Sequence, residues 1–171
     1  MTLFETDRLA VRRLTLADAP FVRDLVTEPL WLEHIGSRNV ETIADAERYL
    51  RDGPLASYAA HGHGLYHVAL KATGEPVGMC GLLQRETLDA PDLGYAFLER
   101  HHGQGYATEA ARATLDHASR DLGLTRVLAF TGPANAASQR VLEKVGMRRV
   151  GPVEVVADPS VLFEIDLADG R

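Results

Sequence analysis

The feature that most constrains the fold is a succession of strand, glycine loop, helix and strand patterns between residues 93 and 131. Residues 93–98 are an apolar strand segment, and the alanine-rich sequence from Gly105 has strong helix propensity until Leu122-Gly123 supplies a helix stop. Residues 126–131 form a second strand segment. Because a strand–helix–strand crossover is right-handed and makes its strands parallel, the sequence predicts one βαβ unit here.

The other strand segments predict antiparallel pairing. They are residues 8–14, 65–70, 77–83, 147–150 and 161–167. The second and third of these are joined by Lys-Ala-Thr-Gly-Glu-Pro, which is typical of a hairpin turn. A mixed, mainly antiparallel sheet with one parallel βαβ unit is an α+β fold. Ligands bind open sheets outside the carboxyl ends of parallel strands, so we expect the site near Leu98 and Thr131.

Two capping-box patterns predict helix starts in the first third of the chain. Thr-Leu-Ala-Asp at residues 15–18 precedes a helix that Pro29 is expected to close. Thr-Ile-Ala-Asp at residues 42–45 precedes a second helix, which Gly53-Pro54 is expected to stop. A further helix is predicted over residues 134–145.

Residues 30–39, between the first two predicted helices, have an irregular pattern that indicates a loop or a broken helix. Loops of this kind often carry substrate specificity. Trp31 and His34 therefore either line an acceptor pocket or pack in the core.

The charge balance disfavours a nucleic-acid binder. Lys and Arg total 18 against 24 Asp and Glu, for a net charge of −6 with neutral histidines, and no block of like charge stands out. A net acidic protein attracts a cationic acceptor slightly more easily. The first residues contain no apolar leader, and no apolar stretch approaches ~18 residues, so we expect a cytoplasmic protein without a membrane span.

Two residue groups could carry chemistry but have simpler explanations. The single cysteine, Cys80, lies in an apolar run without a basic neighbour, so we expect a buried hydrophobe rather than an acyl-cysteine nucleophile. His61, His63 and His67 have the look of a metal cluster. No cysteine or carboxylate joins them at ligand spacing, and we expect no metal site.

The strongest candidate for a binding site is the loop of the βαβ unit, Arg-His-His-Gly-Gln-Gly-Tyr-Ala-Thr at residues 100–108. Gly103 and Gly105 allow the backbone to bend and to approach a ligand, and exposed amides at a helix N-terminus bind anions. A pyrophosphate cradle and a simple tight turn both fit this pattern. The chain has no Gly-x-x-x-x-Gly-Lys-Ser/Thr loop, and it lacks the third glycine of the dinucleotide fingerprint.

Several separated motifs then occur in an order found in one enzyme family. They are Asp92-Leu-Gly-Tyr, the Arg100-x-x-Gly-x-Gly loop with Tyr-Ala-Thr-Glu-Ala, Asn135-x-x-Ser138, and Val-Leu-Glu-Lys-Val-Gly-Met at residues 141–147. Together with the opening Glu5-Thr-Asp-Arg-Leu, they resemble the Gcn5-related N-acetyltransferase (GNAT) superfamily, and within it the RimJ/RimL-like branch. The resemblance covers nearly the whole chain. It implies a single N-acetyltransferase domain over residues 1–171, with helices on both faces of the sheet.

The resemblance implies acetyl-CoA as the cofactor. In relatives, the pantothenate arm pairs like an extra strand with the edge that corresponds to Phe97 and Leu98, where the parallel strands splay apart. A backbone amide near Leu98 would then be the oxyanion donor. Arg100 either adds its charge to the pyrophosphate site or remains a solvated loop residue. The residues expected to hold the pyrophosphate are Gly103, Gln104, Gly105, Tyr106, Ala107 and Thr108.

The resemblance also implies a group that receives the leaving thiolate. Many GNAT members have a tyrosine acid where this sequence has Leu142, and branch members with Asn-x-x-Ser are thought to use the serine instead. We therefore assign Ser138 to the departing thiolate. Asn135 and Ser138 lie one helical turn apart near the expected thioester, so both are also cofactor-binding candidates. Capping of the helix by either residue is the alternative.

Asp92 is the candidate general base, because it matches the acidic position of its motif at the start of the central strand. Glu86 and His102 compete with it, and a water relay or an amine that needs no base is also compatible. Glu109 follows the loop in the first helical turn, where interaction with the helix dipole explains it without catalysis.

The sequence thus predicts transfer of an acetyl group from acetyl-CoA to a primary amine by direct attack in a ternary complex. The acceptor is either a protein N-terminal α-amine or a small amine. The rival hypothesis is a non-catalytic acyl-CoA-binding sensor of the same fold, which Leu142 in place of the tyrosine favours. A homodimer is compatible with the fold.

Overall fold

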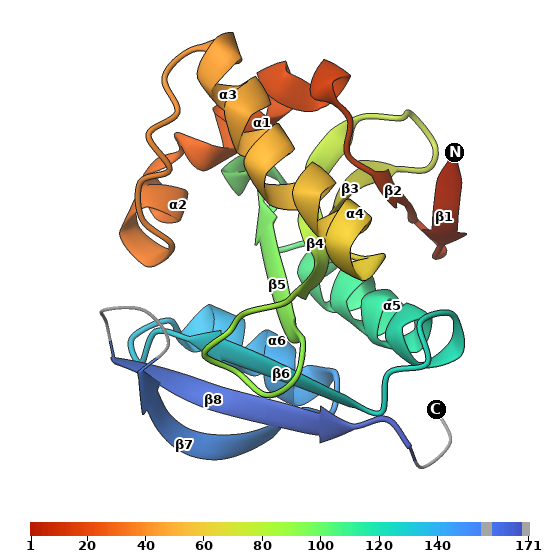
Figure 1. Cartoon of the computed structure of the whole chain (residues 1–171), viewed down its shortest axis with the longest axis vertical. Coiled ribbons are helices and arrows are strands. Elements are labelled where there is room, and N and C mark those ends of the chain that lie inside the picture. The colour runs from red at the N-terminus through yellow and green to blue at the C-terminus, as the bar shows by residue number, and fades with distance from the viewer. Residues whose placement is uncertain (155–158, 169–171) are drawn as a thin grey trace.

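The computed structural model describes residues 1–154 and 159–168, which form an eight-stranded sheet with helices on both faces (Figure 1). The strand order is β1-β2-β3-β4-β5-β6-β8-β7, and every neighbouring pair is antiparallel except the parallel pair β5 and β6. The predicted α+β sheet with one parallel βαβ unit is therefore confirmed. The strands are β1 (Thr2–Glu5), β2 (Leu9–Arg13), β3 (Leu65–Leu70), β4 (Pro76–Leu83), β5 (Asp92–Phe97), β6 (Arg126–Thr131), β7 (Arg148–Glu154) and β8 (Pro159–Asp166).

Two hydrophobic clusters hold the helices against the sheet. On one face, Val22 of α1, Trp31 of α2 and Leu50 of α3 pack in a cluster that includes Leu98. On the other face, residues of α5 and α6 pack in a cluster that includes Phe97. Successive side chains along a strand point to opposite faces, which explains why neighbouring residues 97 and 98 join different clusters. The helices are α1 (Ala19–Val26), α2 (Pro29–His34), α3 (Ile43–Leu50), α4 (Ala56–His61), α5 (Tyr106–Arg120) and α6 (Ala136–Lys144).

The helix that was expected to stop at Gly53-Pro54 continues instead. α3 passes through a π-helical turn, Arg51–Leu55, directly into α4. Proline has no amide hydrogen, and the wider turn lets the chain pass Pro54 without the helical hydrogen bond that this residue cannot make. The helix ends only at Gly62, which has a left-handed φ of 78°.

Other expectations for the N-terminal part are confirmed or extended. The capping box at residues 42–45 is present, and in the first one the Asp18 carboxylate accepts a hydrogen bond from the Thr15 amide at 2.8 Å. Pro29 begins α2, because the first turn of a helix does not need the amide hydrogen that proline lacks. The additional strand β1 is too short for its four residues to show a periodic pattern.

The two parallel strands separate almost at once. Within the described residues, β5 and β6 share a single bridge between Asp92 and Leu128, beside which the Leu128 amide donates to the Pro91 carbonyl at 2.9 Å. Beyond it, β5 continues along β4, whereas β6 pairs with β8 over its whole length (Figure 1). We call the diverging segments, residues 93–97 of β5 and 129–131 of β6, the fork. The splayed βαβ unit implied by the resemblance is confirmed.

Candidate active site

The loop that follows β5 exposes the N-terminus of α5, and we call residues 103–108 the cradle. Gly103 and Gly105 have φ angles of 76° and 82°, a left-handed conformation that favours glycine. Gly105 is the N-cap residue, and it has no side chain with which to cap the helix. The amides of residues 106–108 have no partner within the helix and lie at its positive end. A Cβ atom at Gly103 would meet no atom of the described residues within 4 Å, so the space beside this residue is open to a ligand.

A cluster around Glu109 holds the cradle against the start of the sheet. The Glu109 carboxylate accepts hydrogen bonds from the Thr6 hydroxyl at 2.6 Å, the Arg8 amide at 3.0 Å and Arg8 Nε at 2.7 Å. Arg8 also donates to the Gln104 carbonyl at 2.8 Å, and its guanidinium lies 4.5 Å from the centre of the Tyr106 ring. Burial opposes ionisation of Glu109, but the hydrogen bonds from Thr6 and Arg8 hold its pKa below the usual value.

This contact is not visible in the sequence, where the helix dipole alone explains Glu109 and nothing gives Arg8 a role. Both residues belong to quoted motifs, the opening Glu5-Thr-Asp-Arg-Leu and the Tyr-Ala-Thr-Glu-Ala of the loop. The two positions are 101 residues apart, so neither motif alone could reveal that they meet.

Arg100 turns toward the connection between β3 and β4. Its Nε lies 3.5 Å from the Glu75 carboxylate, and His101 Nε2 lies 3.1 Å from the same carboxylate. The Arg100 side chain is 58% exposed. In this arrangement the charge of Arg100 is paired with Glu75, and its contact with a pyrophosphate stays a prediction.

The backbone of β5 corrects the expected oxyanion donor. The Leu98 amide donates to the Val77 carbonyl of β4 at 2.9 Å, so it points away from the fork. Successive amides of a strand point to opposite edges, and those of Tyr95 and Phe97 are therefore directed toward β6. The Phe97 carbonyl lies 2.7 Å from Nε2 of His102. Leu98 was the wrong residue because the direction of an amide follows the pairing with β4, which the sequence does not specify.

On the face that α6 covers, Tyr95 meets Ser138. The Tyr95 hydroxyl lies 2.9 Å from Ser138 Oγ and donates to the Ser138 carbonyl at 3.1 Å. Burial raises the pKa of Tyr95 despite the opposing hydrogen bond from Ser138, so the phenol stays protonated. Asn135 caps α6, since its Oδ1 accepts the Ser138 amide at 3.2 Å. The Ser138 hydroxyl is thus left for a role other than capping. Leu142, one turn later, is buried in the core.

On the opposite face, Asp92 pairs with Arg85 at the closed end of the fork. Asp92 is buried, its Oδ1 lies 3.0 Å from Arg85 Nε, and the Arg85 guanidinium lies 4.9 Å from the centre of the Phe130 ring. Burial raises the pKa of Asp92 to about 6, although the charge of Arg85 opposes this shift. Asp92 precedes Tyr95 by three residues, or ~10 Å along a strand. An odd spacing puts the two side chains on opposite faces.

The remaining candidates divide between the core and the surface. The Trp31 indole is buried and donates to the Gly36 carbonyl at 3.1 Å, so Trp31 packs in the core, whereas His34 is exposed. Glu86 is exposed in the connection between β4 and β5. Cys80 is fully buried with its Sγ 3.3 Å from the Thr114 hydroxyl, and burial raises its pKa to about 12.

Of the histidines at residues 61–67, His61 and His63 stack with ring centres 6.0 Å apart, and His63 and His67 have different polar neighbours. His63 Nδ1 lies 3.0 Å from the Leu82 carbonyl, while buried His67 lies 4.0 Å from the Asp18 carboxylate. In the part of the chain that the structure describes, no group of three or more His, Cys, Asp or Glu side chains could hold a metal ion.

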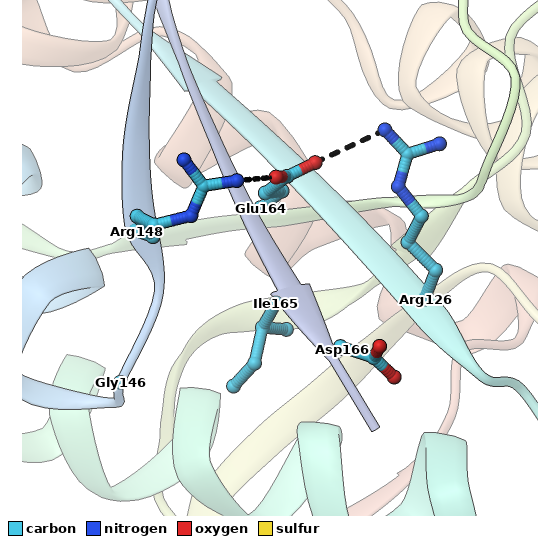
Figure 2. A pocket seen from close by; sticks show the side chains of 6 residues that line it. All are labelled: Arg126, Gly146, Arg148, Glu164, Ile165 and Asp166. Atoms are coloured by element: carbon cyan, nitrogen blue, oxygen red, sulfur yellow. Dashed lines mark hydrogen bonds and ion pairs between the residues drawn. The ribbon is translucent and has the colours of Figure 1, made fainter. Parts of the chain in front are cut away.

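A hollow of about 420 Å³ lies beside the start of β6, at the end of this strand that is remote from the fork (Figure 2). Arg126 and Arg148 reach Glu164 from either side and form ion pairs with it (Figure 2). These ion pairs engage three of the charged side chains that line the hollow, and none of the predicted site residues lines it. Its lining consists of Arg126, Gly146, Arg148, Glu164, Ile165 and Asp166.

Residues 8–148 match the sequence family described as acetyltransferase (GNAT) domain. The chain belongs to this family. None of the helices formed by the described residues is long and apolar enough to cross a membrane.

Relatives of this GNAT chain are found among bacterial proteins. The uncharacterised protein YkkB of Bacillus subtilis is 38% identical over 106 residues, which are 61% of this chain and 62% of YkkB. The uncharacterised N-acetyltransferase p20 of Bacillus licheniformis is 26% identical over 88% of this chain and 85% of its own length. The chain thus spans less than two thirds of YkkB, whereas it spans most of p20.

Solved structures agree with the GNAT fold. An acetyltransferase from Agrobacterium tumefaciens is 30% identical, with a TM-score of 0.80 over 95% of this chain and 92% of that one. RimL, described as a ribosomal L7/L12 α-N-protein acetyltransferase in complex with coenzyme A, is 17% identical, with a TM-score of 0.82 over 97% and 98% of the two chains. At this identity RimL shows the shared fold alone, and this fold is the one that the branch resemblance implies.

The cradle predicts a specific loss of coenzyme A binding in Gly105→Asp. A carboxylate at the N-cap would compete with the pyrophosphate for the helix amides and repel it, so we expect the affinity for CoA to fall by about 10²-fold, or ~2.7 kcal/mol. Isothermal titration calorimetry measures this change. Gly105→Ala is the matched control, because it carries the strain of a left-handed residue without the charge. A folded Gly105→Asp protein that binds CoA like wild type would place the pyrophosphate elsewhere.

Proposed function

We propose that this chain transfers an acetyl group from acetyl-CoA to a primary amine by direct attack within a ternary complex. The observation that carries the proposal is the fork, which leads from the cradle of helix amides to the paired hydroxyls of Tyr95 and Ser138. The cradle offers an anion site for the pyrophosphate, the edge of β5 can pair with the pantothenate arm, and the hydroxyl pair can donate to the thioester. These three groups follow one another in the same order along acetyl-CoA. RimL, which shares the fold, is described as a complex with coenzyme A.

The cradle and the edge of β5 would hold the cofactor. Acetyl-CoA, when bound, supplies the thioester that acts as acyl donor. Residues 103–108 bind its pyrophosphate through backbone amides, while Arg8 and Glu109 keep this loop in place. The edge of β5 that β6 leaves offers the amides of Tyr95 and Phe97. Either of these donates to the oxyanion that develops during attack.

Ser138 would serve the leaving group. Its hydroxyl lies on the α6 side of the fork, and the capping of α6 is carried by Asn135. A hydroxyl in this position stabilises the negative charge that forms on sulfur as the C–S bond breaks. The buried Leu142 has no group that could do so.

Asp92 would act as the general base on the opposite face of the sheet. Its raised pKa of about 6 leaves it ionised at neutral pH yet more basic than an exposed aspartate. The carboxylate is buried beside Arg85 at the closed end of the fork, so a water molecule would carry the proton from the amine. His102 remains the competing candidate, since its Nε2 donates to the Phe97 carbonyl and its Nδ1 is left as an acceptor.

The acceptor is a primary amine, either a protein N-terminal α-amine or a small amine. An α-amine with a pKa of ~7.7–8.0 is partly neutral at pH 7, whereas a lysine at ~10.4 needs more help from a base. The net charge of −6 favours a cationic acceptor over a nucleic acid. We further propose that residues 1–171 act as one domain in the cytoplasm and are able to form a homodimer.

Thiol release from acetyl-CoA tests this function directly. The protein is incubated with acetyl-CoA and a panel of peptides with free N-termini, polyamines and small amines, and free thiol is followed with time. Turnover with any amine supports the enzyme. Tight binding of CoA without turnover across the panel would favour the acyl-CoA sensor instead.

Ser138→Ala separates catalysis from capping. Because a positioned donor typically contributes ~10²–10⁴-fold, we expect kcat to fall by about 10²-fold or more, with CoA affinity within about threefold of wild type. Asn135→Ala, which removes the cap, should instead lower stability by ~0.5–2 kcal/mol. Ser57→Ala is the control for loss of a serine hydroxyl, since Ser57 donates to the His63 carbonyl away from the fork. A near-normal kcat in Ser138→Ala would remove this residue from the mechanism.

The pH profile tests Asp92. As pH rises through about 6, Asp92 loses its proton, so the rate of wild type should rise there and again near the pKa of the amine. Asp92→Asn should lose the lower limb and keep the upper one, whereas the control Asp89→Asn changes an exposed carboxylate and should keep both. The native state holds its Asp92 proton more tightly than the unfolded chain does. The free energy of unfolding of wild type should therefore decline as the pH rises from 4 to 6, and it should decline less in Asp92→Asn. An unchanged lower limb in Asp92→Asn would assign it to another group.

Cys80 should be dispensable for direct transfer. With a pKa of about 12 and no exposed surface, its thiol forms almost no thiolate near neutral pH. Cys80→Ala should lower stability by about 1–3 kcal/mol through lost packing and leave kcat within about twofold. Mass spectrometry of wild type mixed with acetyl-CoA should show no acylated protein. A trapped acyl group that disappears in Cys80→Ala, together with lost activity, would overturn direct attack.

A further inference from the structure

Tyr95 binds both polar atoms of Ser138 that face it. Its hydroxyl lies 2.9 Å from Ser138 Oγ and 3.1 Å from the Ser138 carbonyl oxygen. A carbonyl can only accept, so the hydrogen of Tyr95 is directed at Ser138. One phenol therefore ties a strand on one side of the fork to the first turn of α6 on the other.

The contact between Tyr95 and Ser138 lies beside the fork, and not in a part of the core remote from the candidate active site. Tyr95 lies three residues beyond the bridge between Asp92 and Leu128, where β5 and β6 have already separated. Its backbone amide is directed toward the fork, while its side chain packs with the cluster that α5 and α6 form. The same residue thus presents an amide to the fork and fixes a hydroxyl beside it.

The donors and acceptors of the two hydroxyls limit how their hydrogens can be arranged. Tyr95 has one hydrogen and lies within hydrogen-bond distance of both the Ser138 carbonyl and Ser138 Oγ, and either hydroxyl can be the donor in the contact between them. Hydrogen bonds to an ionised acceptor are about twice as strong as neutral ones. When an anionic sulfur accepts the Ser138 hydrogen, the Tyr95 hydrogen is donated to Ser138 Oγ, which holds the serine oxygen in place.

We propose that Tyr95 is the positioning residue for Ser138, orienting its hydroxyl toward the sulfur that leaves during acetyl transfer. This inference rests on the proposed function. As the C–S bond breaks, its electron pair remains on sulfur and Ser138 donates a hydrogen bond to it. Tyr95 keeps its own proton throughout. The proton of the amine passes through water to Asp92 and from there to solvent, while the thiolate leaves hydrogen-bonded to Ser138 and takes its proton from solvent. Tyr95 thus acts from β5 through Ser138, whereas α6 itself carries no phenol, because it has Leu142 where many GNAT members have a tyrosine.

The test compares the binding of CoA and desulfo-CoA between pH 6 and 9.5 by calorimetry. A site that favours the thiolate should bind CoA increasingly better than desulfo-CoA as pH approaches the thiol pKa of ~8.5. In wild type we expect the ratio of the two affinities to rise by about tenfold over this range. Tyr95→Phe should lose most of this rise, and its kcat should fall by about tenfold with the KM for acetyl-CoA within about threefold.

Two further variants make the result decisive. Ser138→Ala should abolish the same rise, and Tyr95→Phe should add little to it in the double variant, because the two residues act as a unit. Tyr66→Phe is the matched control, since it removes a buried phenol that lies 3.3 Å from His117, and it should keep the full rise. If Tyr95→Phe does not fold, Tyr95→Leu takes its place, because Ser138→Ala tests the serine and not the phenol that positions it.

The outcomes are distinct from those that test the function. A rise that is absent in wild type, or that persists in Tyr95→Phe or Ser138→Ala, overturns the role of Tyr95. The titration needs no acceptor amine and no turnover, so failure to acetylate any amine would overturn the proposed enzyme without altering this measurement. Loss of the rise in the site variants and its retention in Tyr66→Phe supports the inference.

Discussion

The architecture depends on the bridge between Asp92 and Leu128, which in residues 1–154 and 159–168 is the one point where two antiparallel half-sheets are joined. β5 pairs along β4 on one side and β6 along β8 on the other, so each strand of the parallel pair has a complete partner elsewhere. Beyond the bridge, the facing edges have backbone groups that need hydrogen-bond partners. An extended ligand that can act as a strand meets this need, which explains why a loosely joined parallel pair persists at the centre of the sheet.

In the proposed mechanism, the alternation of side chains along β5 places the candidate base and the candidate hydroxyl donor on opposite faces of the sheet. Asp92 points to the face that α1, α2 and α3 cover, whereas Tyr95 points to the face of α5 and α6. A base on one face and a donor on the other can act on the nucleophile and the leaving group without competing for the same space. The polar contacts of Asp92 with Arg85 and of Tyr95 with Ser138 also tie the diverging strands to neighbouring segments.

Features with a local cause could be predicted from the sequence. The strands, the βαβ unit and the glycine loop follow from periodicity and from residues that permit a left-handed turn. Contacts between distant segments could not be predicted, and Arg8 with Glu109 is the clearest case, because two motifs 101 residues apart meet only after the sheet has formed. The prediction of Leu98 as the oxyanion donor was wrong for a related reason, because pairing with β4 turns the Leu98 amide toward the Val77 carbonyl. A shift of one residue in register would have reversed this result.

Tyr95 shows how a residue can be visible in a motif and still lack an assigned role. It stands in Asp92-Leu-Gly-Tyr, yet its task depends on where α6 begins, and Asn135 sets that start by capping the helix. Once Asn135 satisfies the Ser138 amide, the Ser138 hydroxyl and carbonyl are both available to the phenol. A leucine at position 142 in place of the tyrosine is therefore weak support for the non-catalytic acyl-CoA sensor. A hydroxyl donor needs a fixed position beside the fork, and a strand residue that bridges to the helix supplies that position from the opposite side.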